Sequence, residues 1–218
     1  MVISKNIRTI IWDWNGTLLD DIDLCIETIN LLLSKRKLPL LDTARYRDVF
    51  SFPVKDYYAE IGFDFNKEPF EIPAREFINK YNSEVEHCNL HEGTYEVLKH
   101  FHEAGMQQIV LSAMEQVVLE QTLKHNNIFH FFDEVSGLDN HYAHSKIDNG
   151  KSLIKRMNLD PNSICLVGDT VHDFEVAEEL GCQCVLIANG HQSESRLVET
   201  GCKVINDLSE FYSQLTII

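Results

Sequence analysis

Five short apolar runs, spaced along the chain and separated by segments of another periodicity, constrain the fold most strongly. They lie at residues 7–14, 108–112, 134–136, 163–167 and 184–188. Continuous apolar runs of this length are typical of strands buried on both faces. Helical segments are expected at residues 93–103, 116–126, 150–157 and 173–180. This alternation predicts parallel strands with helical crossovers, and so a doubly wound α/β sheet of the Rossmann type.

Residues 19–88 break the alternation. They carry many aromatic side chains, such as Phe50, Tyr57 and Phe77, and no apolar run as strong as those outside them. A connection of roughly 70 residues is far longer than a crossover requires. We therefore expect an α/β core made of residues 1–18 and 89–218, with residues 19–88 inserted as a helical subdomain.

Composition narrows the range of partners. The 218 residues are 44% apolar, enough for one core with a small insert, and the formal net charge is −15. Such a charge disfavours nucleic acid and anionic lipid as partners. No apolar run approaches the ~18 residues of a membrane span, and the first residues lack a signal-peptide pattern. Six scattered cysteines without a CxxC pair suit reduced thiols. We expect a cytoplasmic monomer or homodimer that binds a small molecule.

Polar residues mark the ends of three of the apolar runs. Asp13 follows the hydrophobic part of the first run, Ser112 ends the second, and Asp169 follows the fourth, with Asp173 four residues later. Each alone is typical of a helix cap or a turn. Ligands of open α/β sheets, however, bind beyond the carboxyl ends of the strands. We therefore expect these four side chains to meet in one site.

The residue types in this expected site suggest phosphate chemistry. Three carboxylates need a hard cation, and Mg²⁺ prefers oxygen ligands. Gly16 and Thr17 provide a turn whose amides and hydroxyl suit phosphate oxygens. A carboxylate can act as the nucleophile, and transfer of a phosphoryl group needs cations to offset its charge. The pattern predicts phosphoryl transfer with a lysine close by.

Four segments together resemble the motifs of the haloacid dehalogenase superfamily of phosphatases. They are DWNGTLLD at residues 13–20, LSA at 111–113, a downstream lysine, and GDTVHD at 168–173. Residues 89–114 resemble the segment that leads into the second motif. Residues 185–211 resemble the closing strand and tail of members similar to phosphoglycolate phosphatase. The insert after the first motif resembles the helical C1 cap. The resemblance implies a Rossmann-like core, a cap that sets specificity, and hydrolysis of a small phosphorylated metabolite.

The resemblance also implies roles for individual residues. Asp13 would be the nucleophile and form an aspartyl-phosphate. The backbone carbonyl of Asn15 would bind Mg²⁺ together with the carboxylates of Asp13, Asp169 and Asp173. The phosphoryl group would be held by residues of the turn, of the second motif and by the lysine: Gly16, Thr17, Ser112, Ala113 and Lys146.

The lysine of the third motif is open between two positions. Lys146 lies 23 residues before Asp169 and precedes a helix that Asp148 or Asn149 would cap, a spacing that suits the motif. Lys151 would lie in the first turn of that helix. His141 and His144 precede Lys146 in a segment expected to be a loop.

Asn15 departs from the family pattern. The phosphatases usually have a second Asp here, which protonates the leaving oxygen and then activates water, and an amide does neither. General acid–base catalysis is worth about 10²–10⁴-fold. Three accounts remain open: another acid such as His172, Asp20 or a cap residue; a substrate with a good leaving group or a C–P bond; or a binding module with little turnover. A metal-independent dehalogenase, in which Asp13 attacks carbon, is a further alternative.

Several polar residues near these motifs have simpler expected roles. We expect Asp20 and Asp21 to cap the first helix of the insert, and His172 to face solvent. Arg45, Arg47 and Lys55 lie in a segment that resembles the family's cap loop. Of these, we predict that Arg47 contacts the far end of an anionic substrate.

Overall fold

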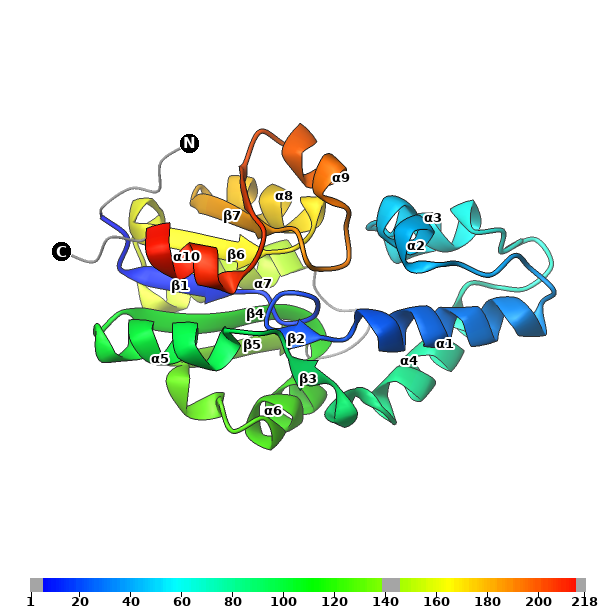
Figure 1. The fold of residues 1–218 in the computed structure, drawn as a ribbon, viewed down its shortest axis with the longest axis horizontal. Coiled ribbons are helices and arrows are strands. Elements are labelled where there is room, and N and C mark those ends of the chain that lie inside the picture. Colours follow the sequence, from blue (N-terminus) through cyan, green and yellow to red (C-terminus); the bar gives the residue numbers. More distant parts are fainter. Residues whose placement is uncertain (1–5, 139–145, 215–218) are drawn as a thin grey trace.

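The computed structural model describes residues 6–138 and 146–214, so His141 and His144 lie outside the described residues. Its centre is a six-stranded sheet in the order β5-β4-β1-β6-β7-β8 (Figure 1). Every neighbouring pair in it is parallel. The strands are β1 (Thr9–Trp12), β4 (Gln107–Glu115), β5 (Glu134–Leu138), β6 (Ile164–Gly168), β7 (Gln183–Ile187) and β8 (Lys203–Ile205).

Helices cover both faces of this sheet. Trp12 points to the face that packs against α5 (Thr94–Glu103), α6 (Gln116–His125) and α10 (Leu208–Gln214). Ile11 points to the other face, which α7 (Lys146–Met157) and α8 (Val171–Leu180) cover. Both residues are fully buried, as a central parallel strand requires. The prediction of a doubly wound α/β core is confirmed.

Three details of the predicted elements were wrong. β8 was not predicted, because three residues are too few to give a periodic signal. The described part of α7 spans Lys146–Met157 rather than starting at residue 150, so Lys146 lies in the helix and does not precede it. β4 continues to Glu115, which places Ser112 inside the strand rather than at its end. The register between β4 and β5 shifts between Leu111 and Glu115. This irregular part of β4 lies largely beyond residue 112, where the apolar run used for the prediction ends.

Residues 19–90 form four α-helices, one short 3₁₀ helix and a two-stranded sheet. The helices are α1 (Ile22–Lys35), α2 (Thr43–Val49), α3 (Val54–Glu60) and α4 (Glu71–Asn82). They lie beside the core, beyond the carboxyl ends of the sheet strands (Figure 1). β2 (Leu19–Asp20) pairs with β3 (Asn89–Leu90) where the chain leaves and re-enters the core, with the short helix η1 (Val85–His87) just before β3. The division at residues 19 and 88 stays a prediction.

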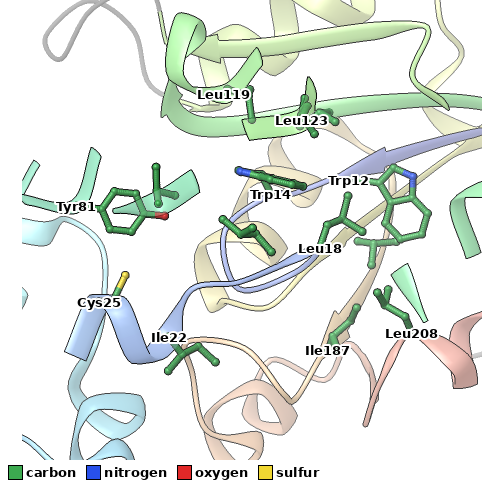
Figure 2. Packing of buried hydrophobic residues seen from close by; sticks show 14 of the residues in the cluster. Trp12, Trp14, Leu18, Ile22, Cys25, Tyr81, Leu119, Leu123, Ile187 and Leu208 are labelled. Carbon is green, nitrogen blue, oxygen red and sulfur yellow. The ribbon is translucent and has the colours of Figure 1, made fainter. Parts of the chain in front are cut away.

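Apolar packing continues from the sheet into the insert. Trp14 and Leu18, on the loop after β1, belong to the same buried cluster as Leu119 of α6 and Tyr81 of α4. Figure 2 shows Trp14 and Leu18 between the core side chains and the insert residues Tyr81 and Cys25. Large side chains buried in this way contribute about 1.5–3 kcal/mol each. The loop that carries Asp13 is therefore supported from both parts of the molecule.

A second contact between insert and core is polar. The segment after β7 reaches the end of α2, where Gln192 Nε2 and Arg196 Nη1 donate to the Phe50 carbonyl (2.8 and 2.6 Å). Ser193 N donates to the carbonyl of Arg47 (3.2 Å). Since a buried carbonyl needs a donor, these bonds satisfy backbone groups at the end of α2. We call residues 189–196 the β7–α9 loop, which runs into α9 (Glu194–Glu199).

Among the helices of the described residues, none is both long and apolar enough to span a membrane.

Candidate active site

The structure brings four charged side chains together at the carboxyl edge of the sheet. Asp13 directly follows β1, Asp169 directly follows β6, Asp173 lies in the first turn of α8, and Lys146 lies in α7. All four are buried. The Lys146 ammonium contacts Asp13 Oδ1 and lies 2.6 Å from Asp173 Oδ1. Carboxylate oxygens of the three aspartates lie within 4.8 Å of one another. We call these residues the nucleophile cluster.

The nucleophile cluster carries more negative than positive charge. Burial raises the pKa of Asp13 to about 7, against the effect of Lys146 and with Asp173 and Asp169 adding to the shift. Burial likewise raises the pKa of Asp169 to about 6. Against burial, Asp13 and Asp173 hold the pKa of Lys146 above its usual value. Three carboxylates beside one ammonium leave a site that a divalent cation would neutralise.

The loop after β1 packs closely on this cluster. Gly16 has φ +73°, and a Cβ there would collide with the Asp169 carboxylate and the His191 ring. The Thr17 hydroxyl lies 2.9 Å from Asp169 Oδ1 and 3.3 Å from Asp13 Oδ2. The turn therefore requires glycine at position 16 for both its backbone conformation and its close approach to Asp169.

The remaining predicted phosphate ligands lie in different surroundings. Ser112 Oγ is 3.5 Å from Asn15 Oδ1 and accepts a bond from Met114 N (3.1 Å). Ala113 is exposed beside it. Lys151 is exposed and pairs with Glu179 on the surface (2.6 Å). Of the two lysines left open by the sequence, the structure places only Lys146 in the nucleophile cluster.

A second buried charged group lies next to the first. Asp21 Oδ1 accepts from Gly16 N (2.8 Å) and lies 3.2 Å from His191 Nε2. Asp21 Oδ2 accepts from Tyr81 Oη (2.6 Å) and from Asn15 Nδ2 (3.0 Å). The expectation that Asp21 caps α1 was wrong. It occupies the N-cap position, but its side chain makes no capping bond because both oxygens accept from these other groups.

Asp21 and His191 form a balanced ion pair. Burial would raise the pKa of Asp21, but His191 and the bonds from Tyr81 and Asn15 hold it at about 2. Burial would lower the pKa of His191, but Asp21 outweighs it and raises the value to about 9. His191 Nδ1 lies 3.0 Å from the Tyr46 hydroxyl. We call Asp21, His191 and Tyr81 the Asp21 cluster.

The two clusters are joined through the backbone of the β7–α9 loop. The amide of His191 donates to Asp169 Oδ2 (2.6 Å). Gly190 is required next to it, since a Cβ there would overlap the Asp169 side chain. One loop therefore positions both a side chain of the nucleophile cluster and the cation of the Asp21 cluster.

Cys25 adds a thiol to this neighbourhood. Its Sγ lies 3.6 Å from Asp21 Oδ2, and Asp21, Cys25 and His191 offer ligand atoms within 4.8 Å of one another. Carboxylate, thiolate and imidazole are ligands that zinc accepts. Both Asp21 oxygens, however, already accept bonds from buried donors, and burial holds the pKa of Cys25 well above its usual value. This chemistry favours a hydrogen-bonded ion pair over a metal site.

Three further predicted residues have different outcomes. His172 was expected to face solvent, but it is half-buried. Its ring lies 4.7 Å from that of Phe52, which belongs to the segment between α2 and α3. Asp20 is exposed. Arg47 donates from Nη2 to the Asn189 carbonyl (3.0 Å), and its Nε is buried with no partner among the described residues.

Sequence reasoning missed His191 and the role of Asp21. His191 follows β7 by four residues, at the same edge of the sheet as Asp13 and Asp169. The rule that singled out those aspartates therefore also applies to the end of β7. Tyr81 gave no such signal, because a tyrosine in an aromatic-rich helical segment is typical of a core position.

The chain is similar to known proteins over most of its length. Residues 10–187 match the family described as "Haloacid dehalogenase-like hydrolase". An N-acetylmuramic acid 6-phosphate phosphatase from Pseudomonas putida is 27% identical over 192 residues, covering 85% of this chain and 84% of that protein. A phosphoglycolate phosphatase from Chromobacterium violaceum is 22% identical over 228 residues, covering 95% and 96%. A solved hydrolase from Streptococcus pneumoniae of the haloacid dehalogenase-like family shares the fold, with a TM-score of 0.84 at 19% identity over 96% and 99% of the two chains.

Proposed function

The chain belongs to the haloacid dehalogenase-like hydrolase family, and on this premise we propose that it is a phosphatase acting on a small phosphorylated metabolite. The observation that carries the proposal is the contact of Lys146 with Asp13 at the carboxyl edge of the sheet, beside Asp169 and Asp173. The named relatives act on a sugar phosphate and on phosphoglycolate, so they support phosphate chemistry without fixing one substrate.

Asp13 is the proposed nucleophile. One of its carboxylate oxygens attacks phosphorus, and the bond between phosphorus and the leaving oxygen breaks, which leaves an aspartyl-phosphate for water to hydrolyse. Lys146 offsets the charge of the incoming phosphoryl group while it holds Asp13 in place. Ser112, whose Oγ lies 3.5 Å from Asn15 Oδ1, would donate to a phosphoryl oxygen.

Mg²⁺ fits the residues of this site. The excess negative charge and the raised pKa values of Asp13 and Asp169 are what a carboxylate group built around a cation shows in its absence. The ion would be held by these two carboxylates, Asp173 and the Asn15 carbonyl, and when bound it would offset charge on the transferring phosphoryl group.

Asn15 favours one class of phosphate. No carboxylic acid stands at this position to protonate a leaving oxygen, so esters of simple alcohols should react slowly. The leaving groups of acyl phosphates, phosphoanhydrides and aryl phosphates are stable as anions, so they depart without first being protonated. We therefore propose activated phosphates as preferred substrates, with alkyl monoesters such as phosphoglycolate hydrolysed more slowly.

The test is phosphate release by the purified protein with and without Mg²⁺, from acetyl phosphate, p-nitrophenyl phosphate and phosphoglycolate. We expect release that requires Mg²⁺ and is lost in Asp13→Asn. Glu27→Gln is the matched control, because it removes an exposed carboxylate from α1 that has no proposed role. Phosphate release from none of the three, or release of halide from a haloacid without metal, would refute the proposal.

A further inference from the structure

The side-chain amide of Asn15 makes two short bonds on one side. Its Nδ2 lies 2.7 Å from Tyr81 Oη and 3.0 Å from Asp21 Oδ2. Tyr81 also donates to Asp21 Oδ2 at 2.6 Å. The three groups thus form a closed triangle of hydrogen bonds, and Figure 2 shows Tyr81 on the insert side of the loop that carries Asn15.

The donors and acceptors of this triangle allow one arrangement. An ionised carboxylate only accepts, so Asp21 must receive both bonds. The hydroxyl hydrogen of Tyr81 is used on Asp21, so the Tyr81 oxygen accepts from Asn15. The group that Asn15 turns toward this pair must then be its NH₂, which has two hydrogens to give. Its Oδ1 consequently faces the other way, toward Ser112 Oγ at 3.5 Å.

Asp21 is itself held firmly. Only 1% of it is exposed, and its second oxygen accepts from Gly16 N and pairs with His191. A buried carboxylate with all of these partners has little freedom to turn away from Asn15. The orientation of the Asn15 amide is therefore imposed from the insert side and from the β7–α9 loop.

We propose that Asp21 is a positioning residue which, with Tyr81, locks Asn15 so that the amide oxygen faces the phosphoryl site. This inference rests on the proposed function. A locked Asn15 can accept a hydrogen bond at the site but cannot donate one to a leaving oxygen. When Asp13 attacks phosphorus, the electron pair of the breaking bond stays on the leaving oxygen, and Asn15 transfers no proton to it.

The lock also predicts what happens when the family's carboxylate is restored. In Asn15→Asp alone, a carboxylate would face that of Asp21 at the distance of the present hydrogen bond, and like charges there are unfavourable. In the exchange variant Asn15→Asp/Asp21→Asn, the new amide at position 21 donates to the new carboxylate. Its oxygen still accepts from Gly16 N, so the pair is rebuilt with the charge moved to position 15.

The experiment compares the wild type, the two single variants and the exchange variant. Thermal unfolding, which needs no activity, is measured without metal. Each single variant should melt lower by roughly 10 °C. In the exchange variant the loss should be clearly smaller than the sum of the two single losses, because the bond between positions 15 and 21 is rebuilt while the ion pair of Asp21 with His191 is not. The second readout is the ratio of kcat/KM for phosphoglycolate to that for p-nitrophenyl phosphate. The ratio should rise about 10²-fold in the exchange variant and less than tenfold in Asn15→Asp.

Glu27→Gln is the control and should change neither readout, since Glu27 is an exposed carboxylate of α1. The inference is overturned if Asn15→Asp alone raises the ratio as far as the exchange does, or if the melting losses of the single variants simply add. If none of the proteins releases phosphate, the proposed function fails, while the melting cycle still decides whether Asp21 and Asn15 are coupled.

Discussion

Two buried groups of charges lie side by side in this molecule, and they are balanced in opposite ways. The nucleophile cluster places Asp13, Asp169 and Asp173 around one lysine, and the pKa values of the first two are raised to about 7 and 6. The Asp21 cluster pairs one carboxylate with one imidazolium, and the pKa of Asp21 is held at about 2.

The contrast separates a group of charges suited to binding a cation from a group that holds the structure around it in place. The first group keeps uncompensated charge in a buried place, which costs stability and is repaired only by a cation. The second has its charge neutralised and its hydrogen bonds made within the protein, so it fixes geometry and needs no ligand. Substitutions in the two groups should therefore move stability and activity in different directions.

The largest expected effect is on activity in Lys146→Met. Removing the ammonium leaves Asp13 without its cation and the phosphoryl group without a charge partner, so kcat/KM should fall about 10³-fold. Steady-state phosphate release from p-nitrophenyl phosphate measures it. The matched control is Lys151→Met, which removes an exposed lysine of the same helix and should keep full activity. The reverse pattern would show that the lysine was misassigned.

His191→Gln should give the largest loss of stability. The pKa of His191 is about 9 in the folded protein against an ordinary 6.5. Its contribution is therefore complete below pH 6.5 and is lost as the pH rises through 9. The free energy of unfolding in EDTA should fall by about 3 kcal/mol near pH 6, and the difference should vanish above pH 9. A difference that is constant with pH would mean that the ion pair contributes nothing.

Asp169→Asn should act in the opposite sense. Because the folded-state pKa is raised from 3.8 to about 6, ionisation of Asp169 weakens the folded state increasingly as the pH rises through this range. The metal-free variant should gain about 2 kcal/mol near pH 8, while Mg²⁺ no longer raises its melting temperature. Chemical denaturation with and without Mg²⁺ measures both. Loss of stability without metal would contradict the idea of uncompensated charge.

Cys25→Ala should have the smallest effect of the four. If the Asp21 cluster holds no metal, the change removes only a small buried side chain and costs about 1 kcal/mol. Thermal unfolding and elemental analysis for zinc of both proteins measure it. Stoichiometric zinc in the wild type that disappears in the variant would show that Asp21, Cys25 and His191 form a metal site after all.

The fold was predictable because the strands of the core are buried on both faces. Runs such as residues 163–167 are continuous and apolar, and the family resemblance covers the same elements. The start of α7 was not predictable in the same way. Residues 146–150 contain a single apolar side chain, Ile147, and so give no helical periodicity, whereas the contacts of Lys146 with Asp13 and Asp173 exist only in the folded chain.

The candidate site was predictable where residues follow strong strands or match a motif of the family. Asp13 and Asp169 could be placed at one edge by the general rule for parallel sheets. The partners of Asp21 could not, because a helix of the insert supplies Tyr81 and the segment after a distant strand supplies His191. Such contacts depend on how the insert packs against the core, and the periodicity of the sequence does not predict that packing.

The β7–α9 loop has a consequence for protein engineering. In a protein with an inserted subdomain, exchanging the insert while keeping the core unchanged is an obvious way to change substrate preference. Here, however, Gln192, Ser193 and Arg196 satisfy carbonyls at the end of α2, and His191 of the same loop pairs with Asp21. An insert taken from another protein would pack against a β7–α9 loop whose hydrogen bonds fit the α2 and Asp21 of this chain. The two segments, more than 140 positions apart in the chain, would have to be exchanged as one cassette.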